Sequence, residues 1–451
     1  MNSDEALFSN QELRKMIFPL FMEQLLVVMV GIVDTLIVSY TSEAAVSGVS
    51  LVNQFNTIFI YLFTALASGG AVIISQYIGG HDNQNAGKSS SQLLMFSTVC
   101  AILIMVLVLI GNEWMLRLLF GKVDEDVMEA CVTYLRISAY SYPALAIYNA
   151  GTAVYRSMGK TDTTMYISII SNVINGVGSC IGVFVLNAGV AGVAWPSLIT
   201  RTFSAVAITM LCFHRNSESS KQVSYNWRWI LSWDGEMLRR IFGIAVPNGI
   251  ENGIFQFVKV ALSSIAALFG TYQIAANGVA QSIWFLAALS GVAMGPAFIT
   301  VIGQCMGNRD TKSAEYYFGK LLKIAVGISA VWNVLILAVS PLLLRFYAIE
   351  PETKKLVFWL VVLHNIFNTI AFPFSSALGC GLRAAGDVKY TMYVSIFTTL
   401  GVRLVLSYLF AIVMQQGVMG LAWAICFDWT VRGIIYFCRL KNGKWKEFKV
   451  I

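Results

Sequence analysis

The sequence predicts an all-α integral membrane protein with twelve transmembrane helices in two pseudo-symmetric six-helix lobes. Three observations predict this class. Hydrophobic residues make up 57% of the 451 residues and charged residues only 12%, about half the charged share of an ordinary soluble protein. Apolar runs of about twenty residues, each long enough to cross the ~30 Å hydrocarbon core, recur along the chain. Residues of the second half repeat those of the first at a constant spacing.

The apolar runs predict six membrane segments on each side of a central polar stretch. Their expected ranges are 14–39, 45–75, 92–111, 131–155, 164–186, 190–213, 242–269, 272–303, 318–344, 355–381, 390–414 and 418–438. The polar stretch 214–241 predicts a cytoplasmic connector between an N-terminal lobe, 1–213, and a C-terminal lobe with a basic tail, 242–451. The polar, acidic start of the chain argues against a cleaved signal peptide, so the first segment is expected to stay as a helix.

The repeat is visible in the spacing of like residues. Pro19 and Glu23 in the first segment match Pro247 and Glu251 in the seventh, 228 positions later. The run GVAGVAW in the first half matches GVMGLAW in the second at the same spacing. Because each copy covers six segments, both copies have the same orientation, and the axis that relates them runs along the membrane normal. Such repeats are typical of transporters with a central binding site.

The placement of Lys and Arg predicts which loops face the cytoplasm. Most of the 31 Lys and Arg residues fall on the side of the termini, including those of the C-terminal tail. Positive residues concentrate on cytoplasmic loops, so we expect cytoplasmic termini in a multi-pass protein of the plasma membrane. This placement accounts for the net charge of +7 without a nucleic-acid partner. The expected partners are the lipid bilayer and small amphipathic molecules, and the expected state is a monomer.

Ionisable residues inside the membrane are the strongest functional signal, because a charge at the bilayer centre costs at least ~2.5 to 3.5 kcal/mol. Asp34 lies deep in the first segment and is a candidate for exchanging a proton or holding a sodium ion. Asn175 and Ser179 share one face of the fifth segment, and Ser197 lies in the sixth. Together the four residues can form an oxygen-rich pocket. Hydrogen bonds that only fix helix packing are the alternative interpretation for each.

Two repeated carboxylates are candidates for a hinge or gate. Glu23 and Glu251 each follow a proline by four residues, and proline loosens a helix and frees a backbone carbonyl. Glu251 also stands about two helical turns before Lys259, so the two can form an internal charge pair. Structural and mechanistic roles remain equally open for these residues.

The second half contains further candidates that have no close match in the first. His364 and Asn368 share a face of the tenth segment, and Arg403 lies in the middle of the eleventh. His364 is either a proton carrier or a hydrogen-bonded packing residue. Asp428 and Arg432 are one helical turn apart in the last segment and predict a structural ion pair.

Missing motifs exclude other classes of function. The sequence has no HExxH, no GxSxG elbow and no paired histidines, so we expect no enzymatic activity. The eight cysteines are scattered without a CxxC pair, which predicts neither disulfides nor a metal site. The stretch GGHDNQNAGKSS has the wrong glycine spacing for a phosphate-binding loop. No cofactor is expected beyond the coupling ion, H⁺ or Na⁺, and sodium at Asp34 is the one metal that the sequence leaves open.

The chain resembles the multidrug and toxic compound extrusion (MATE) family, within a larger group of drug, oligosaccharidyl-lipid and polysaccharide exporters. The resemblance covers almost the whole chain, through PLFMEQLLVVMVGIVDTLIVS, GGAVIISQYIGGHD, VYRSMGKTD, NAGVAGVAW, GLRAAGD and FDWTVR in that order. It implies two six-helix lobes in a V shape. It also implies export of amphipathic, often cationic compounds by alternating access, driven by inward flow of protons or sodium.

The resemblance also implies roles for individual residues. Asp34 matches the family's acidic residue in the first helix, and Asn175, Ser179 and Ser197 match positions that often complete a cation site in the N-terminal lobe. Ser179 stands where many members have a second carboxylate, and Val30 stands where a tyrosine is common. Because one carboxyl is enough to load one proton, we expect proton coupling, with sodium as the alternative.

A lipid-linked oligosaccharide flippase of the same exporter group is the alternative function. Its cavity would be more cationic, since it has to hold a pyrophosphate. Lys259, Arg403 and Arg201 keep this alternative open.

Overall fold

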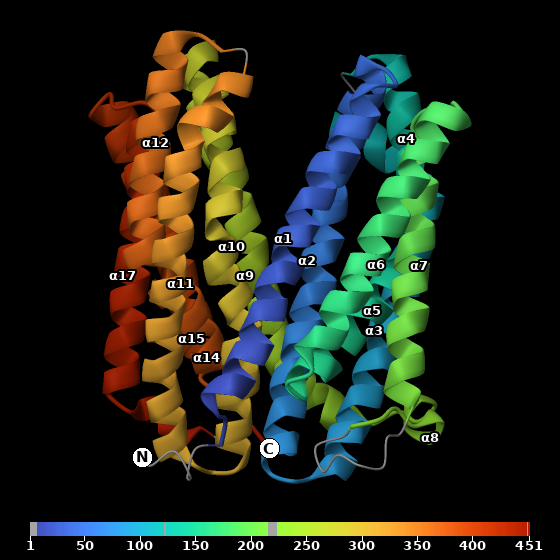
Figure 1. Ribbon diagram of the computed structural model, residues 1–451, viewed down its shortest axis with the longest axis vertical. Helices are drawn as coiled ribbons and strands as arrows, with labels where there is room; N and C mark the ends of the chain where they lie inside the picture. The colour runs from blue at the N-terminus through green and yellow to red at the C-terminus, as the bar shows by residue number, and fades with distance from the viewer. Residues whose placement is uncertain (1–6, 121–122, 215–222, 348, 449) are drawn as a thin grey trace. The chain divides into compact units, whose positions relative to one another are not determined.

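Long apolar helices make up both halves of the protein, as the computed structural model shows (Figure 1). The structure describes residues 7–120, 123–214, 223–347, 349–448 and 450–451, and every regular element in these ranges is a helix. The chain divides into two compact units. One is Arg14–Val246, here the N-terminal unit, and the other is the C-terminal unit, which joins Pro247–Ile451 to the start of the chain up to Leu13.

The N-terminal unit contains the helices that carry the first predicted site. They are α1 (Asn10–Ser39), α2 (Glu43–Gly79), α3 (Asn83–Phe120), α4 (Glu125–Tyr140), α5 (Tyr142–Ser157), α6 (Thr161–Cys180) with its π-helical extension η2 (Ile181–Val185), α7 (Ala191–Phe213) and the short α8 (Trp227–Ile230). Buried apolar side chains of α2, α4 and α5, among them Val52, Leu135 and Ala146, form the core of this unit.

The C-terminal unit repeats this arrangement. It contains α9 (Gly235–Ala266) from Pro247 onward, η3 (Ala267–Phe269), α10 (Thr271–Gly307), α11 (Thr311–Phe346), α12 (Pro351–Ile370), α13 (Phe372–Ser375), α14 (Ala377–Ala384), α15 (Val388–Ile396), η4 (Phe397–Leu404), α16 (Val405–Ser407), η5 (Tyr408–Val413), α17 (Val418–Lys441) and η6 (Lys444–Glu447). Its core contains Val258, Ala287 and Val357.

Ten of the described helices are long and apolar enough to cross a membrane, and α12 with α13–α14 forms an eleventh span, bent by 56°. The predicted segment 131–155 corresponds to α4 and α5, two helices of 16 residues that break at Ser141. Pro143 follows this break, and Pro373 follows the break after α12. Because proline lacks an amide hydrogen, neither helix continues through it without a kink. With the bent pair counted as one, the described spans match eleven of the twelve predicted segments, and the fourth predicted segment corresponds to two helices that are each shorter than a span.

Two repeated aspartates begin helices outside the apolar spans. Asp310 precedes α11 and accepts a hydrogen bond from the backbone amide of Ser313 at 2.9 Å. Asp82 accepts one from the amide of Asn85 at 3.0 Å, at the equivalent turn before α3. Hydrogen bonds from the hydroxyl and amide of Ser313 hold the pKa of Asp310 below its usual range. The repeat therefore includes the capping chemistry of the loops as well as the apolar runs.

The helices η2 and α7 of the N-terminal unit approach each other at two glycines. A Cβ atom on Gly182 would lie 2.2 Å from the backbone oxygen of Gly192, and a Cβ on Gly192 would lie 2.7 Å from the backbone of Gly182. In the C-terminal unit, a Cβ on Gly420 would lie 2.6 Å from the backbone nitrogen of Ala411. Glycine lets backbones touch at these crossings, as is usual between membrane helices.

Replacing Gly192 by Ala is therefore expected to separate η2 from α7 and to lower the free energy of unfolding by about 1–3 kcal/mol, as overpacking does. Gly176→Ala in α6 is the matched control, because no atom lies within 4 Å of a Cβ placed there. The measurement is the midpoint of thermal unfolding of each purified variant in detergent. Equal midpoints for the two variants would contradict the close approach.

The connector and the tail pack on the units that they follow in the sequence. Of the predicted connector 214–241, residues 215–222 lie outside the described part, and the rest packs on the N-terminal unit, where Tyr225 donates its amide to the carbonyl of Cys212 at 2.9 Å. The tail packs on α11 through Trp445, which is fully buried and lies edge-on to Phe318.

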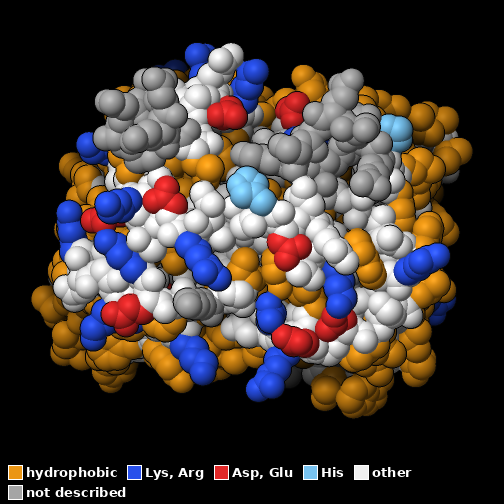
Figure 2. All heavy atoms as spheres, turned by 90° about the horizontal axis from the view of Figure 1, so that it is seen from below, with side chains coloured by type: hydrophobic (Ala, Val, Ile, Leu, Met, Phe, Trp, Pro, Cys, Tyr) orange, Lys and Arg blue, Asp and Glu red, His pale blue; other side chains and the backbone are white. Residues whose placement is uncertain are grey.

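Figure 2 shows charged side chains gathered on the end of the molecule where the C-terminus lies, with hydrophobic side chains around them. This distribution agrees with an end that projects from the membrane into water. The cytoplasmic orientation of this end stays a prediction from the placement of Lys and Arg.

Candidate functional site

Asp34 is held by one amide side chain in the N-terminal unit. It lies on α1 and is half-buried. The Nδ2 atom of Asn175, on α6, donates to both carboxylate oxygens of Asp34, at 2.8 Å and 3.0 Å. Among the described residues Asp34 forms no ion pair. Its carboxylate therefore remains available to a positive ion.

The amide of Asn175 is oriented from its other side. Ser197, on α7, donates its hydroxyl hydrogen to the Oδ1 atom of Asn175 at 3.2 Å, and the carbonyl of Val193 is an alternative acceptor at 3.1 Å. Asn175 therefore presents its NH₂ group to Asp34 and its oxygen to Ser197. A chain of hydrogen bonds joins α1, α6 and α7 through these three predicted residues.

Ser179 is the predicted site residue that does not join this chain. It lies one turn beyond Asn175 on α6, and its side chain is fully buried. Its hydroxyl has no hydrogen-bond partner among the described residues. The structure brings together Asp34, Asn175 and Ser197, and it leaves Ser179 beside them with an unused hydroxyl.

Arg201 is a neighbour of the site that the sequence did not single out as a site residue. It lies one turn after Ser197 on α7, and its Nη1 atom donates to the hydroxyl of Ser141 at 2.7 Å. Its positive charge acts on Asp34 and on Tyr134 through space. The signal for its position was its spacing of four residues from Ser197, which places both residues on one helix face.

Glu23 is buried in an ion pair within the N-terminal unit. The Nη2 atom of Arg156, on α5, lies 2.7 Å from its Oε1 atom, and Thr164, on α6, donates to its Oε2 atom at 3.1 Å. The hydroxyl of Tyr148 donates a longer bond of 3.5 Å. Glu23 therefore ties α1 to α5 and α6. The predicted fourth segment ends at residue 155, whereas α5 continues to Ser157 and includes Arg156 in its last turn.

Glu251 forms the corresponding pair in the C-terminal unit. The Nη1 atom of Arg383, on α14, lies 2.9 Å from its Oε2 atom, and Ser395, on α15, donates to its Oε1 atom at 2.8 Å. The charge pair of Glu251 with Lys259 that the spacing allowed is absent from the described residues. Eight residues rotate a helix by about 80° beyond two full turns, so the two side chains leave α9 on different sides.

Arg403 belongs to a buried cluster of three charges. Its Nε atom donates to the Oδ2 atom of Asp428, on α17, at 2.8 Å. Arg432 lies 2.8 Å from the Oδ1 atom of the same carboxylate, which confirms the predicted pair of Asp428 and Arg432. Thr398 and Thr399 accept two further hydrogen bonds from Arg432, at 2.9 Å and 2.7 Å. Two arginines and one carboxylate give the cluster one surplus positive charge.

His364 and Asn368 lie in the packed interior of the C-terminal unit. The Nδ1 atom of His364 lies 2.8 Å from the carbonyl oxygen of Leu360, so Nδ1 carries the hydrogen. The ring of His364 lies edge-on to that of Trp429. Asn368 donates to the side-chain oxygen of Asn333 at 3.0 Å and to a backbone carbonyl of α10 at 2.9 Å. Both residues have the contacts of packing residues.

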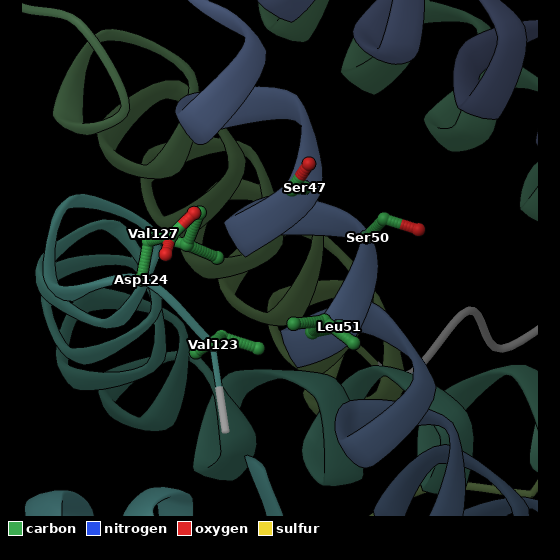
Figure 3. Close-up of a pocket in the computed structure, with 6 residues that line it drawn as sticks. All are labelled: Ser47, Ser50, Leu51, Val123, Asp124 and Val127. Carbon is green, nitrogen blue, oxygen red and sulfur yellow. The ribbon is translucent and has the colours of Figure 1, made fainter. Parts of the chain in front are cut away.

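The structure shows no arrangement for a larger metal site. Within the ranges that it describes, no group of three or more His, Cys, Asp or Glu side chains can hold a metal ion. An open hollow of ≈ 400 Å³ lies between α2 and the start of α4 (Figure 3). Its lining residues are Ser47, Ser50, Leu51, Val123, Asp124 and Val127. None of the predicted site residues is among them.

One family model matches this chain twice, once in each half. The family model described as MatE matches residues 19–181 and again residues 247–409. An uncharacterized transporter of Bacillus subtilis, YisQ, is 26% identical over 432 residues, which are 95% of this chain and 93% of that protein. A probable multidrug resistance protein of Thermotoga maritima, NorM, is 22% identical over 450 residues, which are 98% of this chain and 94% of that protein.

Solved structures share the fold along almost the whole chain. A crystal structure of MATE in the straight conformation has a TM-score of 0.89 at 20% identity, and the match covers 97% of each chain. An outward-facing structure of a multidrug resistance MATE family transporter has the same score and identity and covers 97% of this chain and 96% of that one. The predicted fold class is confirmed.

Proposed function

Because the chain belongs to the multidrug and toxic compound extrusion family, we propose that it is a secondary antiporter that exports amphipathic, cationic molecules in exchange for protons. Relatives named as multidrug resistance proteins support export of drugs or metabolites across the plasma membrane. They also make an oligosaccharide flippase the less favoured alternative. The observation that carries the coupling mechanism is that Asp34 contacts one amide and, among the described residues, forms no ion pair with a basic side chain.

Protonation of Asp34 changes which atoms can face each other. A carboxylate only accepts hydrogen bonds, whereas a protonated carboxyl also donates one. The NH₂ group of Asn175 has donors and no acceptor, so a proton on one oxygen of Asp34 removes one of its two acceptors and leaves the other. Protonation therefore weakens the contact of Asn175 with Asp34 and favours a rotation of the amide. Because its oxygen is bonded to Ser197, the change reaches α6 and α7.

This rearrangement links proton loading to alternating access. A ligand shifts a conformational equilibrium only as far as it prefers one state over the other. The proton prefers the state in which α1, α6 and α7 have rearranged, and the substrate prefers the state in which Asp34 is ionised. Entry of a proton therefore releases the substrate, and the inward proton gradient drives export.

The donor arrangement supports a proton over a sodium ion. Sodium requires several oxygen ligands, and Asp34 is the one carboxylate in this chain of hydrogen bonds. The oxygen of Asn175 faces Ser197 rather than Asp34. A sodium ion at Asp34 would have to displace the NH₂ group of Asn175, which contacts both carboxylate oxygens, whereas a proton needs one oxygen only.

Replacing Ser179 by Asp is expected to create sodium dependence. The new carboxylate would leave α6 on the face of Asn175, one turn from it and beside Asp34. Two carboxylates repel each other, so the variant is expected to be less stable than the parent until sodium neutralises them. The measurement is the midpoint of thermal unfolding at increasing sodium chloride, with choline chloride at equal ionic strength.

Ser179→Asn is the matched control, because asparagine has the same size and no charge. Sodium is expected to raise the midpoint of Ser179→Asp by several degrees and to leave Ser179→Asn and the parent unchanged. A sodium effect of equal size on the parent protein would show that the parent already binds sodium, which contradicts proton coupling.

The proposed function is tested with the full chain in liposomes. A proton gradient and a sodium gradient are imposed separately, and accumulation of a cationic rhodamine dye is followed by fluorescence. We expect dye transport with the proton gradient, collapse of transport when a protonophore dissipates that gradient, and no transport with sodium alone. Transport with sodium alone would reject proton coupling, and transport with neither gradient would reject antiport.

A further inference from the structure

The helix α9 presents three different sides after Pro247. Val258 and Leu262 are buried, and they lie on the side that packs into the C-terminal unit with Glu251. A second side is polar and consists of five residues, here called the polar lane: Asn248, Asn252, Gln256, Lys259 and Ser263. At 100° per residue these five side chains leave the helix within an arc of about 80°.

The third side of α9 is apolar and exposed. Three large hydrophobic side chains there have exposed fractions between 45% and 67%: Ile250, Phe257 and Val260. The polar lane lies between this exposed apolar side and the buried side, and its exposure increases along the helix from Asn248, which is buried, to Lys259 and Ser263, which are exposed.

Water has to reach the polar lane at the depth of Lys259. Lys259 lies ten residues before Phe269, at the end of the span, or about 15 Å along the axis, which is half of a hydrocarbon core of ~30 Å. A lysine in lipid at this depth would cost at least ~2.5 kcal/mol. Membrane proteins place such residues against protein or against a water-filled path, and the exposed lane favours the path.

Lys259 has no carboxylate to neutralise it. Among the described residues its contact is the ring of Phe285, on α10, whose centroid lies 4.9 Å from its Nζ atom. Glu251 is engaged by Arg383 and Ser395. The residue 228 positions earlier, in the same place of the first repeat, is Gly31. The fold therefore does not require a charge at this position.

The surroundings of Lys259 suit an anionic group attached to an aromatic ring. The ammonium group can bind a carboxylate, and the exposed ring of Phe285 offers a face for stacking. The amides of Asn252 and Gln256 add hydrogen-bond donors along the same lane. The cluster of Arg403, Asp428 and Arg432 gives the C-terminal unit a surplus positive charge, which attracts an anion.

We propose that Lys259 binds the carboxylate of those transported molecules that carry one beside an aromatic ring and a cationic group, and that it thereby selects among substrates. This inference rests on the proposed export function and assigns one residue that determines its specificity. The cationic group makes the molecule a substrate for the proposed exchange with protons. Its carboxylate contacts Lys259 in the polar lane beside Phe285.

The test compares two dyes that differ in one functional group. Rhodamine 110 is a zwitterion with a free carboxylate, and its methyl ester, rhodamine 123, is a cation with the same ring system. Fluorescence anisotropy gives the dissociation constant of each dye for the purified full chain in detergent. Lys259→Met is expected to weaken binding of the free acid about tenfold and to leave binding of the methyl ester unchanged or tighter.

Two further variants complete the test. Lys259→Arg keeps the positive charge and is expected to retain most of the affinity for the free acid. Lys320→Met is the matched control, because Lys320 also lies over aromatic rings, those of Tyr316 and Tyr317, on α11. It should change neither dissociation constant. Equal weakening of both dyes by Lys259→Met, or unchanged binding of the free acid, would overturn the proposal.

The two proposals fail in different experiments. Binding in detergent needs no ion gradient, so a variant that cannot couple transport to protons still reports whether Lys259 discriminates between the dyes. Conversely, loss of proton-driven transport in liposomes with both dyes would reject the antiport function while leaving the contact of Lys259 with a carboxylate in place.

Discussion

Asp34→Asn is expected to abolish dye accumulation driven by a proton gradient, down to the level of liposomes without protein. An asparagine side chain does not gain or lose a proton at physiological pH, yet its oxygen can still accept a hydrogen bond from Asn175. The loss of one charge-assisted hydrogen bond should cost the fold only about 1–3 kcal/mol. The variant should therefore insert and elute as a single species, and its defect should appear in coupled transport.

Asp34→Glu is the control for this prediction, because it keeps a carboxyl that can be protonated. It should retain part of the proton-driven transport, whereas Asp34→Asn should retain none. Proton-driven transport by Asp34→Asn at the rate of the parent protein would remove Asp34 from the mechanism and leave the family assignment alone standing.

Asp428→Ala is expected to destabilise the C-terminal unit strongly. The side chain of Asp428 is fully buried and is the one carboxylate paired with both Arg403 and Arg432. Removing it leaves two guanidinium groups in the interior without a counter-charge, and breaking a buried ion pair in this way costs about 3–5 kcal/mol. The midpoint of thermal unfolding in detergent should fall sharply, and the yield of folded protein should fall with it.

The matched control removes a carboxylate from an exposed pair. Glu125→Gln breaks the pair of Glu125 with Arg117, in which both side chains are exposed, and it should leave the midpoint unchanged. A triple variant, Asp428→Leu with Arg403→Met and Arg432→Met, removes all three charges and should recover most of the stability. An Asp428→Ala midpoint equal to that of Glu125→Gln would contradict the role of the buried cluster.

Sequence patterns were sufficient to predict those features that depend mainly on the hydrophobicity of single segments. The cost of placing polar groups in lipid makes each apolar run a helix, so the segments and the repeat at 228 residues predicted an all-α membrane fold. Gly192 and Gly420 fall in the repeated GVAGVAW and GVMGLAW runs, and the structure shows why glycine is needed there. Asp34 and Asn175 were found because polar residues at that depth are rare.

Partner choice among the charged residues was not predictable in the same way. Arg156 and Arg383 lie just beyond the predicted segments 131–155 and 355–381, yet the structure places them in α5 and α14, paired with Glu23 and Glu251. Arg403 joins Asp428 from a different helix, 25 residues away in the sequence. A helical pattern fixes the face of a side chain, but it does not say which other helix lies against that face.

The sequence by itself therefore determined the class of protein, the positions of its long apolar helices and the residues that are too polar for lipid. Only the tertiary structure decided which of these residues have an ion-pair partner within their unit and which remain able to bind water or substrate. The reason is that hydrophobicity acts on each segment independently, whereas an ion pair or a hydrogen bond needs two atoms within about 3 Å, and that distance is set by the packing of several helices at once.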